Sequence, residues 1–189
     1  MNYASQGEPA DEELLEGARR GEDRAFALLV DRYQGIVAAT AIGMLGPGDD
    51  AEDVGQETFI RFHRSLDRFR GESSIATYVT RIAINLSLTA LKRRKRWTER
   101  FKASERGLDF VADENDPQRD LEQRQRIEWV RTAIETLSPK HRTVVVLRLI
   151  DGYSTRETAR ILKVPQGTVM SRLARAMGFL ESQLKEMEP

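Results

Sequence analysis

The sequence predicts an all-α protein of two small helical domains joined by a flexible linker, with a helix-turn-helix in the C-terminal domain. Apolar residues recur every three or four positions through most of the chain, which is the period of helices packed on a core. Between the two periodic regions, residues 98–116 lose this pattern and mix charges with Gly and Asn. We therefore expect domains at 1–97 and 117–189 and a linker at 98–116.

Four helices are expected in the first domain. Asp11 can cap a short helix that ends near Gly21, and a long apolar helix follows from residue 24 to the Gly46-Pro47-Gly48 break. A third helix begins at residue 49 or 50 and ends near residue 66. Its buried stripe comprises Ala51, Val54, Thr58, Phe62 and Leu66.

The fourth helix follows an irregular stretch at 67–74, where Ser73 or Ser74 can cap it. Its apolar positions keep the helical period before the chain enters a basic run at 92–96. These positions are Ile75, Tyr78, Val79, Ile82, Leu86 and Ala90.

Four more helices are expected in the second domain. Asp116-Pro117 and Ser138-Pro139 are start signals for helices to about Leu137 and Ile150. The second of these is expected to be the buried spine of the domain through Val144, Val145, Leu147 and Leu149. Ser154 and Glu157 have capping-box spacing, so a short helix should follow and end at Leu162 or Lys163. The last helix begins after Pro165, and its apolar stripe is Val169, Leu173, Met177, Leu180 and Leu184.

Composition excludes several classes of chemistry. The 189 residues include no Cys and only two His, so disulfides, zinc fingers, thiol catalysis and iron-sulfur clusters are not expected, nor is any metal or cofactor. The N-terminus lacks the pattern of a signal peptide, and no stretch approaches the roughly 20 apolar residues of a membrane span. We expect a cytoplasmic protein.

Charge is balanced overall but segregated along the chain. Lys plus Arg and Asp plus Glu both number 30, so coating of nucleic acid by net charge is not expected. Acidic residues gather at 11–23 and 49–57, and a basic block follows at 92–102. This asymmetry indicates two partners, one for each sign of charge.

Three groups of residues are candidates for binding. The last helix presents short polar side chains and arginines near its start, as a helix in a DNA major groove needs: Gln166, Thr168, Ser171, Arg172 and Arg175. The alternative is an ordinary helical hairpin with a solvated face.

The second group combines aromatic, amide and basic side chains on and before the fourth helix: Phe69, Tyr78, Arg81, Asn85, Lys92, Arg93 and Arg94. Such a mixture suits unstacked bases and a phosphate backbone, although a basic helix end also favours its own macrodipole. The third group lies on one side of the third helix, where Ile60 stands among polar residues: Asp50, Asp53, Gln56 and Glu57. It predicts a docking surface for a basic partner, with a solvated face as the alternative.

Residues 50–96 resemble the second conserved domain of extracytoplasmic-function (ECF) sigma factors, and residues 137–177 resemble their fourth. The resemblance implies a factor without catalytic activity that binds core RNA polymerase, directs promoter-specific initiation and is controlled by an anti-sigma factor. It places Asp50, Asp53, Gln56, Glu57 and Ile60 against the clamp helices of the largest polymerase subunit.

The same resemblance assigns promoter contacts. The loop at 67–74 would capture a base flipped from the non-template strand, through Arg68, Phe69, Arg70, Gly71, Ser73 and Ser74. Tyr78, Arg81, Asn85, Lys92, Arg93 and Arg94 would read the −10 element, and residues 166–175 the −35 element. Gly55 stands where the family usually has an apolar residue and Tyr78 where it usually has Trp, which leaves the docking geometry and the lining of the −10 pocket open.

Two other functions fit parts of the sequence. A stand-alone helix-turn-helix regulator would use the last helix but would leave the acidic helix and the basic block without a role. A magnesium-dependent prenyl synthase would use the DDxxD pattern at 49–53, but such an enzyme needs a large apolar cavity and a second acidic cluster.

Overall fold

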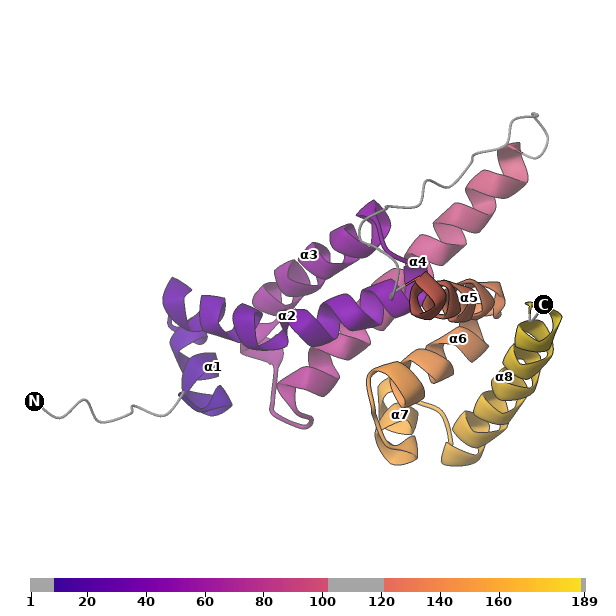
Figure 1. Ribbon diagram of the computed structural model, residues 1–189. Helices are drawn as coiled ribbons and strands as arrows, with labels where there is room; N and C mark the ends of the chain where they lie inside the picture. The colour runs from indigo at the N-terminus through magenta and orange to yellow at the C-terminus, as the bar shows by residue number, and fades with distance from the viewer. Residues whose placement is uncertain (1–8, 102–120, 188–189) are drawn as a thin grey trace, which may run out of the picture.

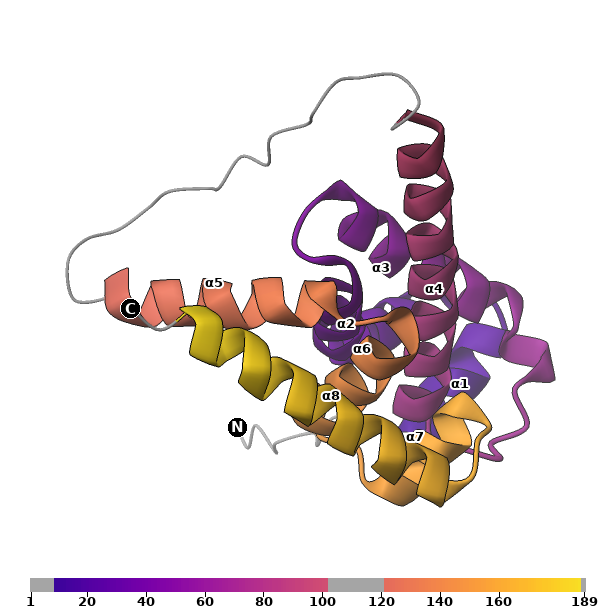
Figure 2. The ribbon, with the colours of Figure 1, turned by 90° about the vertical axis from the view of Figure 1, so that its right-hand side faces the viewer.

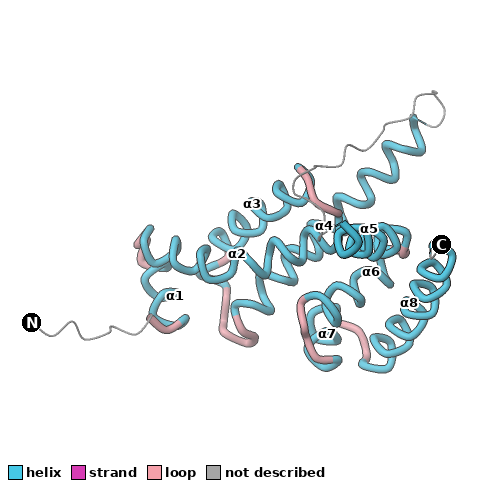
Figure 3. Tube along the Cα trace, viewed as in Figure 1, coloured by secondary structure: helices cyan, strands magenta, loops and turns pink. Residues whose placement is uncertain are grey.

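The structure, a computed structural model, describes residues 9–101 and 121–187, and every regular element in these ranges is helical (Figures 1 and 3). This confirms the predicted all-α class. The N-terminal domain contains α1 (Asp11–Arg19), α2 (Asp23–Leu45), α3 (Asp49–Arg64), the short 3-10 helix η1 (Leu66–Arg68) and α4 (Ile75–Phe101). The C-terminal domain contains α5 (Leu121–Thr136), α6 (Pro139–Val145), the π-helical turn η2 (Val146–Ile150), α7 (Thr155–Leu162) and α8 (Gln166–Met187).

The long helix α2 is the centre of the N-terminal domain, and α1, α3 and α4 pack around it. The predicted stripe on α3 is buried, with Phe62 fully enclosed. Of the predicted stripe on α4, Ile75, Val79, Leu86 and Ala90 are buried, whereas Tyr78 and Ile82 are partly buried. The helix also buries Thr80, Ala83, Ile84 and Ser87. The last turns of α4, which carry the basic run, project beyond the other helices (Figure 1).

The helix-turn-helix of the second domain forms as predicted. The Ser154 hydroxyl accepts a hydrogen bond from the Glu157 backbone N–H at 3.2 Å, and the Glu157 carboxylate accepts one from the Ser154 N–H at 2.8 Å. This reciprocal cap starts α7. Lys163 ends α7 in the left-handed region, with φ +53°, so that the chain turns at once into α8.

Several boundaries and burial expectations were wrong. Ala10, not Asp11, is the N-cap of α1, because the Asp11 carboxylate is bound by Arg32 and Tyr33 of α2. The third helix stops at Arg64 and the fourth continues to Phe101, into the segment predicted as linker. The rest of that segment, 102–116, lies outside the described residues, as does the predicted start of the fifth helix.

Two apolar residues that were expected in the core are exposed instead. Leu149 is 54% exposed because the chain widens into the π-helical turn η2, which rotates it away from the core. Met177 is 37% exposed, and the neighbouring Ala176 is buried in its place.

Among the described residues, α2 is long and apolar enough to cross a membrane by length and composition, with a mean hydropathy of 1.3 over its best window. The expectation that no segment approaches this length was therefore wrong. In the fold, however, Leu29, Val37, Ala41, Met44 and Leu45 of α2 are buried against other helices. Because 28% of this window is buried, these contacts account for part of the apolar character of α2.

The two domains pack directly against each other. Val146 and Leu147 of η2, Tyr153, and Ile161 of α7 belong to the same buried apolar cluster as the core of the N-terminal domain. Figure 2 shows α6 and α7 beside α2 and α4. The buried spine expected for the second domain therefore also serves the first.

Polar contacts accompany this apolar interface. The buried Arg142 of α6 donates to the Met44 carbonyl at the end of α2, at 2.6 Å, and to the carbonyls of Glu135 and Leu137 at the end of α5. Thr80 of α4 is hydrogen-bonded to the Tyr153 hydroxyl at 2.8 Å. Thr40 of α2 donates to the Asp151 carboxylate at 2.9 Å.

The close approach of α2 to η2 predicts that Gly43→Leu separates the domains. A Cβ at Gly43 would lie 3.1 Å from both γ carbons of Val146, so a larger side chain cannot fit without moving η2. Overpacking of this kind costs about 1–3 kcal/mol. We expect small-angle scattering to report an increased radius of gyration. Gly35→Leu is the matched control on the same helix, because nothing lies within 4 Å of a Cβ there; identical scattering from both variants would contradict the interface.

The buried carboxylate of Asp151 predicts a pH-dependent stability. Burial raises the pKa of Asp151 to about 6, and the hydrogen bond from Thr40 opposes only part of this rise. Because the folded state binds the Asp151 proton more tightly than the unfolded state does, protonation stabilises the fold, and this contribution is complete at pH values below the ordinary pKa of 3.8. The contribution is lost as the pH rises through the folded-state pKa of about 6. Asp151→Asn should therefore stabilise the protein in chemical denaturation at pH 7.5, by an amount that shrinks at pH 5. An equal gain at both pH values would rule out this explanation.

Candidate functional site

The predicted docking surface is an exposed face of α3. Asp53 and Gln56 are exposed, and the apolar side chain of Ile60 is 45% exposed beside them. Glu57 is partly buried and accepts a hydrogen bond from Arg61, one turn later, at 2.7 Å. The face thus keeps the mixture of carboxylate and apolar surface that was predicted for a partner.

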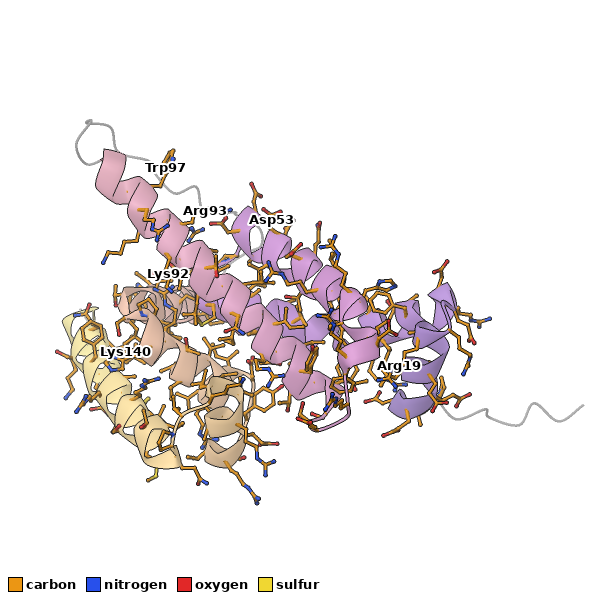
Figure 4. The ribbon with its side chains drawn as sticks, turned by 180° about the vertical axis from the view of Figure 1, so that it is seen from behind. Arg19, Asp53, Lys92, Arg93, Trp97 and Lys140 are labelled. Atoms are coloured by element: carbon orange, nitrogen blue, oxygen red, sulfur yellow. The ribbon has the colours of Figure 1, made fainter. Side chains whose placement is uncertain are left out.

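Asp50 differs from the other members of this surface because its carboxylate binds the basic block of α4. One oxygen accepts from Arg93 at 2.7 Å and the other from Arg94 at 2.6 Å. Arg94 also donates to the Leu45 carbonyl at 3.0 Å, so it helps to end α2. Figure 4 shows Asp53 on α3 near the part of α4 that carries Lys92, Arg93 and Trp97. The two surfaces that were predicted to be separate therefore meet at Asp50.

Aromatic rings hold the start of the loop at 67–74. Phe69 is 6% exposed, and its ring packs edge-on against Tyr78 with centroids 4.9 Å apart and against Phe62 at 6.4 Å. The Arg81 guanidinium lies over the Tyr78 ring, 5.2 Å from its centroid. Phe69 therefore supports the loop from inside, while Tyr78 and Arg81 stand at its surface.

The loop borders a hollow of about 1020 Å³. Seven of its lining residues were predicted as −10 contacts: Arg68, Phe69, Arg70, Ser73, Ser74, Tyr78 and Arg81. Asp67, Glu72 and Thr77 complete the N-terminal part of the lining. Three guanidinium groups and two carboxylates of the N-terminal domain thus surround aromatic surface, and the guanidinium groups suit a phosphate while the Tyr78 ring suits a base.

Glu157 and Arg160 of α7 also line this hollow, and sequence reasoning missed both. No local pattern could have indicated them, because they come from the other domain and reach the hollow only through the interdomain contact. Hydrogen bonds from Ser154 lower the pKa of Glu157, so this carboxylate is held in its charged form.

The remaining predicted −10 residues, Gly71 of the loop and four residues of α4, do not line the hollow. Asn85 is exposed on α4, one turn beyond Arg81, and Lys92 is exposed near the projecting end of the helix. Arg93 and Arg94 are engaged by Asp50. The structure thus divides the predicted −10 group into a part around the hollow and a second part further along α4.

The predicted −35 residues share the first turns of α8. Gln166, Ser171 and Arg175 are exposed, whereas Thr168 and Arg172 are partly buried. Ser171 donates to the Thr168 carbonyl at 3.1 Å, which aligns its hydroxyl along the helix.

The start of α6 adds positive charge to this face. Helix α6 packs against α8, and burial lowers the pKa of His141 while the positive charges of Lys140, Arg175 and Arg172 lower it further. Lys140 is exposed and was not predicted (Figure 4). Its position in the sequence, at a helix start before an apolar helix, offered no indication of a binding role.

Comparison with known protein families matches both domains. The family description Sigma-70 region 2 matches residues 29–97, and Sigma-70, region 4 matches residues 127–180. This chain is 32% identical to the RNA polymerase sigma-H factor of Pseudomonas aeruginosa, and the match covers 94% of this chain and 95% of that protein. This chain belongs to the ECF family of sigma factors. The ECF RNA polymerase sigma-E factor of Haemophilus influenzae is 33% identical, with 94% of this chain and 96% of that protein covered.

Solved structures agree on the fold of this ECF sigma factor. The structure of CnrH in complex with the cytosolic domain of CnrY is similar with a TM-score of 0.68 and 26% identity, over 95% of this chain and all of CnrH. The sigma factor RpoE of Bartonella quintana, solved with the anti-sigma factor NepR, is similar with a TM-score of 0.67 over 85% of this chain and 96% of that one. At 23% identity the second similarity concerns the fold alone.

The DDxxD pattern of α3 has another role in the structure than the one a prenyl synthase would require. Asp50 binds two arginines, which occupy the carboxylate oxygens that a metal would need. Throughout 9–101 and 121–187, no three His, Cys, Asp or Glu side chains gather as a metal site would demand. Family membership makes this chain a sigma factor, so the prenyl-synthase interpretation is abandoned.

Proposed function

We propose that this sigma factor divides its tasks between three surfaces and carries no catalytic residue of its own. The docking face of α3 binds the clamp helices of the largest polymerase subunit through Asp53, Gln56, Glu57 and Ile60, with Asp50 at its edge. The observation that carries this proposal is the mixed face of α3, on which the 45% exposed Ile60 lies with the exposed Asp53 and Gln56 and could form an apolar contact surrounded by polar ones. Domain 2 is assigned to residues 1–97 and domain 4 to 117–189, and the protein acts in the cytoplasm.

The hollow beside the 67–74 loop is the proposed site of base capture from the −10 element. Arg68, Arg70 and Arg81 supply positive charge around it, and Tyr78 supplies a partly exposed ring. Unstacking a base costs a few kcal/mol, which a fitted pocket returns, so opening of the promoter is a binding equilibrium. Because Glu157 and Arg160 of α7 line the same hollow, we infer that α7 withdraws when promoter DNA enters.

The first turns of α8 are proposed to enter the major groove of the −35 element. Gln166, Thr168 and Ser171 carry short polar groups for base edges, and Arg172 and Arg175 can bind guanine or phosphate. Lys140 is added as a phosphate contact from α6. A neutral total charge is consistent with weak DNA binding by the free factor and selective binding as part of the holoenzyme.

An anti-sigma factor is the proposed regulator. The Bartonella RpoE was solved with the anti-sigma factor NepR, and CnrH was solved with the cytosolic domain of CnrY. By analogy, we infer a protein that covers the polymerase and DNA surfaces of this chain until a signal removes it.

Reconstitution tests the function as a whole. The purified chain is added to core polymerase without another sigma factor, and transcription start sites are mapped across the genome. We expect transcription from a small set of promoters that share −10 and −35 sequences. Failure to associate with core polymerase, in the absence of any inhibitor, would refute the proposal.

Asp53→Arg is predicted to prevent holoenzyme formation while leaving the fold intact. The substitution places a positive charge against a basic partner, and such opposition costs several kcal/mol, so the affinity should fall by about 100-fold or more. Affinity for core polymerase is measured by fluorescence anisotropy. Asp31→Arg, an equal charge change at an exposed position of α2, is the control and should bind normally. Wild-type affinity of Asp53→Arg would contradict the docking assignment.

Arg172→Ala and Lys140→Ala are predicted to weaken −35 binding in different ways. Loss of a side chain that reads a base costs about 1–3 kcal/mol and relaxes the preference at one base pair. Loss of a phosphate contact weakens binding to all sequences equally, and it lowers the slope of the logarithm of the binding constant against the logarithm of the salt concentration by about one unit. Holoenzyme binding to a series of single-base variants of the −35 element separates the two. A uniform loss for both variants would show that Arg172 reads no base.

A further inference from the structure

Arg19 is the last residue of α1 and does not belong to the proposed DNA surface. Its side chain contacts the loop that borders the hollow. Its Nε donates to the Leu66 carbonyl at 3.0 Å, and one of its terminal nitrogens donates to the Phe69 carbonyl. These two carbonyls lie in η1 and directly after it, where the loop begins. Figure 4 shows Arg19 beside α1, on the side of the molecule away from α8.

The loop is anchored at both ends. At its start, Arg19 holds the backbone of Phe69 while Phe62 and Tyr78 hold its ring. At its end, the Ser74 hydroxyl accepts from the Thr77 N–H at 3.2 Å and so caps α4. The residues between these anchors, 70–73, include Gly71 with φ +72°, a conformation that other residues adopt with strain.

The position of Arg19 is fixed by the packing of α1 on α2. Leu14, Leu15 and Ala18 of α1 are buried, and Asp11 at the other end of the helix binds Arg32. A planar guanidinium can donate to two carbonyls at once with little freedom to rotate, which a more flexible ammonium cannot do as well. Arg19 therefore transmits the rigid position of α1 to the start of the loop.

We propose that Arg19 is a positioning residue for base capture: it holds the loop in the shape that accepts a flipped base, without contacting DNA. The inference rests on the −10 function proposed for the hollow and extends it to a residue of α1. A pocket that is shaped before binding does not lose free energy to the ordering of its own loop. Loss of Arg19 should consequently weaken capture of the base and leave polymerase docking unchanged.

The experiment uses the holoenzyme and a fluorescent non-template-strand oligonucleotide from a promoter identified by transcript mapping. A second oligonucleotide is abasic at the captured position. Arg19→Met keeps the apolar stem but removes the donors, and we expect it to bind the complete oligonucleotide about tenfold more weakly, equivalent to about 1.4 kcal/mol. The ratio of the affinities for the complete and the abasic oligonucleotide, which we call the abasic penalty, should shrink by a similar factor. Arg19→Lys, which keeps the charge but not the planar fork, should lose affinity to an intermediate degree.

Arg20→Ala is the matched control, because this neighbouring side chain is exposed and is bound to Glu22. It should behave as the wild type with both oligonucleotides. Salt titration separates positioning from a direct phosphate contact: positioning leaves the salt dependence of Arg19→Met unchanged, whereas a lost phosphate contact would lower it by about one unit of slope.

Three results would overturn the proposal. The first is an unchanged abasic penalty in Arg19→Met, and the second is a lowered salt dependence. The third is an equal loss of affinity for core polymerase, which would indicate a general effect on the fold. If the wild-type holoenzyme itself does not distinguish the abasic oligonucleotide, base capture at this hollow fails and the role of Arg19 fails with it. Normal transcription with no abasic discrimination would separate that outcome from failure of the sigma function.

Discussion

The buried guanidinium of Arg142 holds the end of α2 and the end of α5 in one arrangement. It donates to backbone carbonyls of both domains at helix C-terminal ends, where the carbonyls have no N–H partner within the helix. Burial lowers the pKa of Arg142, while the charge of Glu135 opposes this effect. Separation of the domains would take the Met44 carbonyl away from Arg142 and leave this buried charge with fewer partners, which disfavours separation. The position of α7 over the hollow follows from this arrangement.

The charged surfaces of the free protein partly neutralise one another. Asp50 of the docking helix binds Arg93 and Arg94 of the proposed DNA-binding helix; the arginine side chains are 70% and 42% exposed, and that of Asp50 is 21% exposed. Exposed ion pairs contribute little to stability, typically up to about 1 kcal/mol. A phosphate or a polymerase side chain can therefore replace either partner at small cost. The pairing brings two proposed binding surfaces into direct contact without fixing either of them permanently.

Local chemistry made the elements predictable. The capping box of Ser154 and Glu157, the stripe on α3 and the break at Gly46 each act over a few residues, and each appears in the structure as expected. Errors occurred where a distant group competed or where the chain departed from α-helical geometry. Asp11 binds Arg32 and Tyr33 instead of capping its own helix, and Leu149 turns outward where the chain forms a π-helical turn. Neither competitor leaves a periodic pattern in the sequence.

The sequence by itself determined the all-α class, the order of the helices and the family, because periodicity, caps and motifs are local. Only the tertiary structure decided that Val146 and Leu147 complete the core of the other domain, that α7 borders the loop, and that Arg19 holds it. These contacts join residues about 50 to 110 positions apart, such as Thr40 with Asp151 and Arg19 with Phe69. Their partners are chosen by the packing of whole helices, which no short segment of the chain specifies.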